Sequence, residues 1–136
     1  MSIEENKAII RHLFEEVWGN GNLAAADQFY AAGPYLEGLK QFATALYTAF
    51  PDWHATIEDL ISEGDKVVVY WIGQGTHRAE WDGIQPTGKQ VKIIGIDIER
   101  MVDGKIVEEH SNVDMLGFLQ QIGAIQIMGQ DKTNES

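Results

Sequence analysis

The chain has 136 residues, of which 44% are hydrophobic and 10% aromatic, enough for one folded domain and too many for a disordered chain. It carries ten Lys and Arg and twenty-one Asp and Glu, and its net charge of −11 argues against nucleic acid or an anionic membrane as partner. Cysteine is absent, which excludes disulfides, a thiol nucleophile and cysteine-ligated zinc. No stretch looks like a secretory signal or a membrane span, so we expect a cytoplasmic protein.

The first fifty residues have helical periodicity. A first helix is predicted from Ser2 to Trp18, because Ser2 and Glu5 form an S-x-x-E capping box and apolar residues then recur at helical spacing. Glycines around Asn20 end it, and a short second helix starts at Asn22. A third helix is predicted over Pro34–Phe50, with proline at its first position.

After residue 52 the pattern changes to alternation, which is typical of strands. Asp103-Gly104 is the strongest hairpin signal, and Asp114 is best explained as the cap of a last short helix. We predict a domain over residues 1–125 and a polar C-terminal tail over 126–136. The predicted strands and last helix are Trp53–Ser62, Lys66–His77, Gln90–Met101, Lys105–Val113 and Met115–Ile122.

Helices followed by a run of strands predict an α+β fold in which the helices pack on one face of an antiparallel sheet. Gly73, Gly75 and Gly95 lie inside predicted strands, where glycine permits sharp curvature. A curved sheet around a helical layer would leave a conical pocket.

Four stretches resemble one known family: ENKAIIRHLFEEVWGNGNL, GLKQFATALYTAFPDWHATIEDLISEGDKVVV, GTHRAEWDGIQPTGKQV and ERMVDGKIVEEHSNVDMLGFLQQIG. They are similar to the SnoaL-like polyketide cyclases, which belong to the nuclear-transport-factor-2-like (cystatin-like) superfamily. The resemblance implies a cone-shaped curved sheet with three N-terminal helices on its concave face. It also implies a homodimer packed through the outer face of the sheet, and no metal or organic cofactor.

The resemblance also implies site residues. In the family an Asp on the last strand acts as general acid/base in an aldol ring closure, and a His on the preceding strand assists it. Ser111 stands at the position of that Asp, and Asp97 at the position of that His. His77 matches the His that ends a G-x-H strand, so the resemblance implies a position at the pocket mouth, whereas the sequence alone equally allows a surface histidine at the strand end. Relatives also carry a longer segment between Phe29 and Pro34, so one wall of the pocket is expected to be missing here.

Asp97 interrupts the apolar run from Val91 to Ile98, where a carboxylate is costly unless it has a partner or a function. A two-residue turn at Asp103-Gly104 would put His110 opposite Asp97, whereas a β-bulge in either strand would put Ser111 there. The first register predicts an acid/base pair of Asp97 and His110, with His77 nearby. The alternatives are a hydrogen-bonded strand histidine and a carboxylate held by a neighbouring strand.

The remaining candidates are aromatic. Residues at helical or strand spacing could line a pocket for a flat apolar ligand or could simply form the core. They are Trp18, Phe29, Tyr30, Trp53 and Trp71, with Ser111 added from the resemblance. The four histidines have no metal-ligand spacing, so we expect no metal site.

Together these features predict a cofactor-independent proton-transfer enzyme of cyclase or isomerase type, acting on a small hydrophobic carbonyl compound. Ser111 and the short connection after Phe29 favour an alternative, a non-catalytic dimeric module that binds small ligands or partners. A third hypothesis, epoxide hydrolysis, needs an Asp-Arg-Asp set. Odd spacing puts Arg100 on the face of the strand opposite to Asp97.

Overall fold

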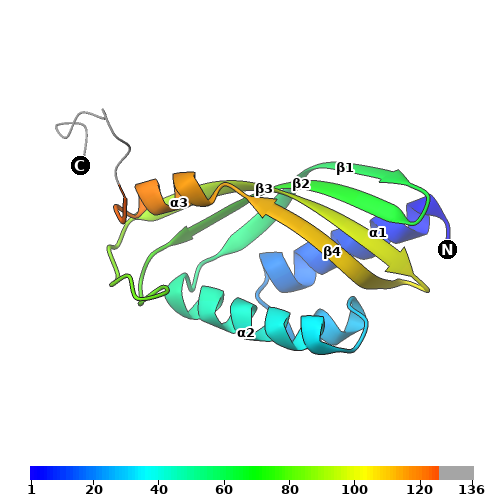
Figure 1. Ribbon diagram of the computed structural model, residues 1–136, viewed down its shortest axis with the longest axis horizontal. Helices are drawn as coiled ribbons and strands as arrows, with labels where there is room; N and C mark the ends of the chain where they lie inside the picture. The colour runs from blue at the N-terminus through cyan, green and yellow to red at the C-terminus, as the bar shows by residue number, and fades with distance from the viewer. Residues whose placement is uncertain (126–136) are drawn as a thin grey trace.

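The computed structural model describes residues 1–125 as a helical layer packed on a four-stranded antiparallel sheet (Figure 1). The strands lie in the order β1-β2-β3-β4, and α3 follows β4 at the end of the sheet far from the N-terminus. The helices are α1 (Ile3–Leu13), η1 (Phe14–Gly19), η2 (Leu23–Gln28), α2 (Pro34–Ala49) and α3 (Met115–Gln121). The strands are β1 (His54–Glu63), β2 (Lys66–Thr76), β3 (Gln90–Val102) and β4 (Lys105–Val113). This is the predicted α+β architecture.

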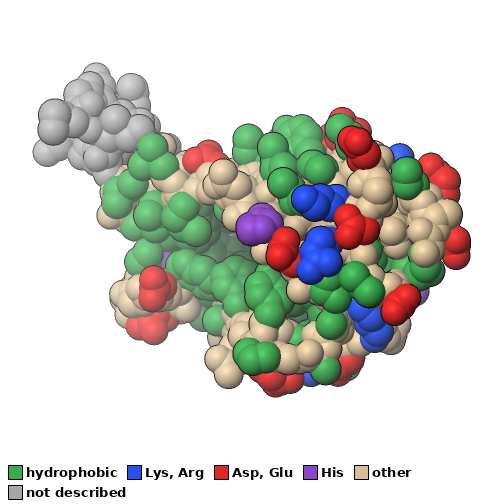
Figure 2. Space-filling model, turned by 45° about the vertical axis from the view of Figure 1, so that its right-hand side comes forward, with side chains coloured by type: hydrophobic (Ala, Val, Ile, Leu, Met, Phe, Trp, Pro, Cys, Tyr) green, Lys and Arg blue, Asp and Glu red, His purple; other side chains and the backbone are tan. Residues whose placement is uncertain are grey.

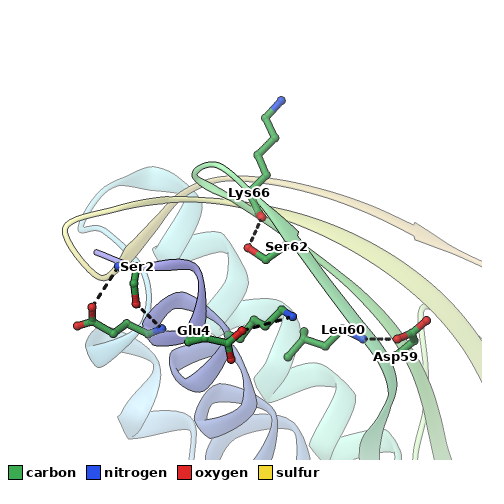
Figure 3. A network of polar contacts seen from close by, with 8 residues as sticks. Ser2, Glu4, Asp59, Leu60, Ser62 and Lys66 are labelled. Carbon is green, nitrogen blue, oxygen red and sulfur yellow. Dashed lines mark hydrogen bonds and ion pairs between the residues drawn. The ribbon is translucent and has the colours of Figure 1, made fainter.

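The predicted capping box starts α1. The backbone N–H of Glu5 donates to Ser2 Oγ at 3.1 Å, and the backbone N–H of Ser2 donates to Glu5 Oε1 at 3.1 Å (Figure 3). The sequence predicted a single helix up to Trp18. In the structure the helix widens from Phe14 into a π-helical turn, in which the backbone N–H of Asn20 donates to the carbonyl of Glu15. Both Phe14 and Trp18 line the cavity described below.

The residues of strand β3 alternate between the two faces of the sheet. Its side chains alternate strictly, so that Ile93, Asp97 and Glu99 point to the helical side, whereas Ile94 and Ile96 point outward. The hairpin at Asp103-Gly104 is present, and both residues have positive φ. A bulge accompanies it, because Arg100 pairs with Glu108 while Met101 pairs with Ile106. This extra residue in β4 decides which side chains meet Asp97.

Two strand glycines make room for tryptophans on the concave face. A Cβ at Gly95 would lie 2.2 Å from the Trp71 ring, and one at Gly73 would lie 2.3 Å from the Trp53 ring. Both indoles therefore lie directly on the backbone of the sheet. The sequence favoured these glycines for curvature; they also determine where the aromatic floor of the cavity lies.

No helix in residues 1–125 combines the length and the apolar character that crossing a bilayer requires. The predicted tail, residues 126–136, lies outside the described residues, so the division of the chain at residue 125 stays a prediction.

Candidate active site

A cavity of about 510 Å³ lies between α2 and the concave face of the sheet. Aromatic and aliphatic side chains from the N-terminal helices, all four strands and α3 form nearly all of its wall. Figure 2 shows a hollow on this side of the molecule with hydrophobic side chains inside it. The polar side chains that reach the cavity come from the end formed by β3, β4 and the start of α2: Tyr35, Asp97, Glu109 and Ser111.

Most of the predicted pocket residues line this cavity. Trp18, Trp53, Trp71 and Ser111 are on its wall, as is Asp97. Phe29 and Tyr30 are not, and for them the pocket prediction is wrong: both are buried in the core. The Phe29 ring makes a T-shaped contact with the His12 ring, and the Tyr30 ring has its centroid 6.1 Å from that of Tyr35.

Asp97 is buried at the polar end of the cavity. The bulge in β4 puts Ser111 directly opposite it, and Ser111 Oγ donates a hydrogen bond of 2.7 Å to Asp97 Oδ1. Burial, reinforced by the negative charge of Glu109, raises the pKa of Asp97 to about 6, although the Ser111 hydroxyl and the Trp71 indole act in the opposite direction. Asp97 is thus a carboxylate that can both accept and release a proton near neutral pH.

His110 does not meet Asp97. It pairs with Ile98 on the outer face, its side chain is 73% exposed, and its Nε2 lies 3.6 Å from Glu108. The register predicted from a plain two-residue turn is therefore wrong, and the bulged alternative is the one present. The physical reason is the period of two along a strand: one added residue moves every later side chain to the other face.

His77 does not reach the cavity either. Its side chain is 0% exposed and stacks on Phe50, with ring centroids 5.2 Å apart. The backbone N–H of Thr87 donates to its Nδ1, and its Nε2 has no hydrogen-bond partner among the described residues. The expected position at the pocket mouth is wrong, because the connection after β2 folds back over this side chain.

Two glutamates that the sequence analysis did not select complete the polar end. Glu99 is two residues after Asp97 on the same face of β3, and Glu109 pairs with Glu99 across the strands. Glu99 is 0% exposed, and neither of its carboxyl oxygens accepts a hydrogen bond. Burial first, then hydrogen bonding to Glu109 and the charges of Glu109 and Asp97, raise the pKa of Glu99 far above its ordinary value. Glu99 is therefore protonated at neutral pH and can donate to Glu109.

Two tyrosines bind the other side of Glu109. Tyr30 donates its hydroxyl proton to Oε2 at 3.3 Å, and the Tyr35 hydroxyl donates to Oε1. The short connection between η2 and α2 positions them: the backbone of residues 29–31 pairs with Ile106 of β4, where Ala31 N–H donates to its carbonyl at 2.9 Å. The first two residues of α2, Pro34 and Tyr35, follow directly after this connection and form part of the cavity wall, whereas none of residues 29–33 lines the cavity.

The sequence contained a signal for this cluster. Alternation along Ile96-Asp97-Ile98-Glu99 already puts two carboxyl groups on one face, and a carboxylate at every second position of a buried face is unusual. Glu109 could not be added without knowing the bulge. One carboxyl oxygen from each of Asp97, Glu99 and Glu109 lies within 4.8 Å of the others, a spacing that could also hold a cation. Hydroxyl protons from Tyr30, Tyr35 and Ser111 already point at these oxygens.

Comparison with solved structures identifies the same architecture. TsrD from Streptomyces laurentii is 22% identical, with 92% of this chain and 99% of that one aligned at a TM-score of 0.80. AclR from Streptomyces galilaeus, named a candidate hydroxylase, is 24% identical over 92% of this chain and 100% of that one, with a TM-score of 0.81. A candidate polyketide cyclase from Acidithiobacillus ferrooxidans is 30% identical over 90% of this chain and 97% of that one, with a TM-score of 0.77.

No curated protein shows significant similarity to the chain. The family model of the SnoaL-like polyketide cyclases, however, matches residues 8–122, which include every strand and all of the cavity wall. The chain therefore belongs to the SnoaL-like polyketide cyclase family.

Proposed function

We propose that the protein catalyses a cofactor-independent proton transfer on a small hydrophobic carbonyl compound, in a reaction of cyclase or isomerase type. One observation carries this proposal: a buried carboxylate, Asp97, lies at the polar end of a largely apolar cavity, with its pKa raised to about 6. A general base works best when its pKa lies near the working pH, and a dry cavity lets it act on a weakly acidic C–H bond.

The reaction uses Asp97 as the base. Its carboxylate takes the proton from a carbon next to the substrate carbonyl; the C–H electrons form a C=C bond, and the carbonyl oxygen becomes an enolate. In a cyclisation the enolate carbon attacks a second carbonyl of the same molecule, a C–C bond forms, and Asp97 returns the proton to the new alkoxide. In an isomerisation Asp97 returns the proton to a different carbon.

Two neighbours support Asp97 in this role. The Ser111 hydroxyl donates to one carboxylate oxygen and orients the group. The Trp71 indole N–H is buried at the same wall and acts on the carboxylate in the same way as the Ser111 hydroxyl, favouring the charged form of Asp97 and so lowering its pKa. Asp97 and Ser111 are directly opposite each other, and the resemblance puts the family's His and Asp at these two positions. The catalytic carboxylate would then have moved across to the neighbouring strand.

An exchange assay tests the base without knowledge of the natural substrate. 2-Tetralone, a flat ketone with acidic α-protons, is incubated with the protein in D₂O, and deuterium uptake is followed by mass spectrometry. Asp97→Asn is expected to reduce the catalysed exchange by about 100-fold or more. Ser111→Ala is expected to keep activity but to move the pH profile upward, because the hydroxyl lowers the pKa of Asp97. The control variant is Asp65→Asn, which changes an exposed aspartate in the turn between β1 and β2. Equal exchange by Asp97→Asn and the unmodified protein would remove Asp97 from the mechanism.

The non-catalytic binding module remains the second candidate, favoured by the Ser at the family's acid/base position. It predicts that the cavity binds 2-tetralone without accelerating exchange. The epoxide hydrolase hypothesis gains no support from the structure, because Arg100 lies on the outer face, with its Nε 3.8 Å from Glu108. No guanidinium group in residues 1–125 lines the cavity.

We further propose that the protein is a homodimer, as the resemblance implies, in the cytoplasm. The outer face of β3 exposes Ile94, Ile96 and Ile98 at 47%, 50% and 39%, beside Tyr70 of β2. A row of exposed isoleucines of this kind is typical of an interface. Light scattering should give twice the chain mass, and Ile96→Glu should reduce it to one chain. A monomeric mass for the unmodified protein would contradict the dimer.

A further inference from the structure

The ionisable side chains on the wall of the cavity are acidic. Asp97 and Glu109 line it, and no Lys, Arg or His from residues 1–125 does. Arg100, the basic residue nearest to them along β3, points to the opposite face of the sheet, where it contacts Glu108. The polar end of the cavity therefore carries negative charge without a protein cation beside it. A carboxylate in a largely apolar cavity is costly without an opposite charge beside it, so a cationic ligand would offset part of this cost.

The buried proton of Glu99 determines which carboxyl groups of the cluster carry the negative charge. Three ionised carboxylates within 4.8 Å would repel one another strongly, and protonation of Glu99 removes one of the three charges. Glu109 accepts hydrogen bonds from the hydroxyl groups of Tyr30 and Tyr35, and Glu99 lies directly opposite it across the strands. The charge that remains is on Glu109 and Asp97, the two members of the cluster that reach the cavity.

The rest of the wall suits a cation attached to an apolar ring. Four tryptophans line the cavity, at positions 18, 53, 71 and 81. The indoles of Trp53 and Trp71 each lie against a strand glycine on one side, and both also line the cavity. Aromatic faces attract cations, tryptophan most strongly, and they equally accept flat hydrocarbon rings.

A bare metal ion fits the cluster less well than an organic cation. Hydroxyl protons of Tyr30, Tyr35 and Ser111 point at the oxygens that would have to bind the metal, and the Glu99 carboxyl group is sealed from the cavity. An ammonium group needs only the acceptor capacity left on Asp97 and Glu109, and its hydrocarbon part fills the apolar volume behind it.

We propose that the cavity takes a hydrophobic amine, with a protonated nitrogen held by Asp97 and Glu109 and an apolar ring system among the tryptophans. This deepens the proposed function, on which it rests, by naming a basic nitrogen as a feature of its carbonyl substrate. Binding and proton transfer are measured separately, so one can fail without the other.

The test compares three ligands of nearly the same shape: 1-naphthylmethylamine, 1-naphthalenemethanol and 1-naphthoic acid, which are cationic, neutral and anionic near neutral pH. Dissociation constants are measured by calorimetry in about 150 mM salt, where long-range attraction by the net charge is screened. The amine is expected to bind about tenfold more tightly than the alcohol, and the acid most weakly.

The matched variants are Glu109→Gln and Glu108→Gln. Glu109 faces the cavity, whereas Glu108 is its neighbour on the outer face. Glu109→Gln should bring the amine to within about threefold of the alcohol and leave alcohol binding unchanged, whereas Glu108→Gln should retain the full amine preference. If Glu109→Gln does not fold, Asp97→Asn provides the same comparison.

Equal binding of amine and alcohol by the unmodified protein would overturn the proposal, as would tightest binding of the acid. An amine preference that survives both Glu109→Gln and Asp97→Asn would overturn it too, because the attraction would then come from elsewhere. The 2-tetralone exchange assay is independent of these results. Loss of exchange in Asp97→Asn with no amine preference would leave the proposed function standing and remove only the amine.

Discussion

Replacing Asp97 by Asn should change how the stability of the protein depends on pH. The folded chain holds the Asp97 proton up to about pH 6, whereas the unfolded chain loses it near the ordinary aspartate pKa of 3.8. A raised carboxyl pKa therefore contributes stability that is fully present below pH 3.8 and is lost as the pH rises through about 6. The difference between the pKa of Asp97 in the folded and in the unfolded chain corresponds to about 3 kcal/mol of folding stability, since one pKa unit is worth roughly 1.4 kcal/mol. Asn cannot ionise, so Asp97→Asn escapes this loss.

The measurement is urea unfolding of the unmodified protein and of Asp97→Asn at intervals between about pH 4 and pH 8, the range over which the proton is lost. The difference in free energy of unfolding should move in favour of the variant by about 3 kcal/mol across this range and then level off. Using the change with pH cancels any constant effect of the substitution on packing or on the Ser111 hydrogen bond. Asp65→Asn, in the exposed turn between β1 and β2, should show a flat difference. A flat difference for Asp97→Asn as well would refute the argument that Asp97 is buried in an unfavourable environment.

Three further predictions concern stability. Glu99→Gln should raise the free energy of unfolding at neutral pH by about 1–3 kcal/mol, because glutamine can donate to Glu109 without taking up a proton on folding. A lower free energy of unfolding in urea for this variant would contradict a protonated Glu99. Gly95→Ala should cost about 1–3 kcal/mol of folding stability, since its Cβ would lie 2.2 Å from the Trp71 ring. Gly38→Ala, on the part of α2 that lines the cavity, should stabilise the fold by roughly 1 kcal/mol, because the added Cβ meets no atom within 4 Å. Equal effects of the two substitutions on urea unfolding would show that the indole can move freely. Ser2→Ala should lower stability by about 1 kcal/mol through loss of the cap of α1, and unchanged thermal unfolding would mean that this helix end frays in solution.

The sequence predicted the order and approximate bounds of the elements because their signals are local. Ser2 and Glu5 cap a helix from three residues apart, and Asp103-Gly104 needs only its own backbone to turn. Asp114 accepts from the backbone N–H of Gly117, as a helix cap should. Asp97 was also detectable, because a carboxylate in an apolar strand stands out without knowledge of its neighbours.

The candidate site could be predicted only in part, because its members meet across strands. Because the register shifts at the β4 bulge, opposite Arg100 and Met101, Ser111 and not His110 pairs with Asp97, and Glu109 pairs with Glu99. His77 was expected at the pocket mouth, with the surface end of the strand as the alternative, yet the connection after β2 buries it completely.

The amino-acid sequence by itself determined an acidic α+β domain with a carboxylate set into an apolar strand, since helix caps, turns and alternation depend on neighbours along the chain. Only the tertiary structure decided what that carboxylate faces. Cross-strand register is a property of two segments and the turn between them, so a single extra residue in β4 exchanges an imidazole for a hydroxyl and a second acidic group. The same long-range packing places indole rings on strand glycines and leaves the cavity hollow, because neither contact is encoded within one segment.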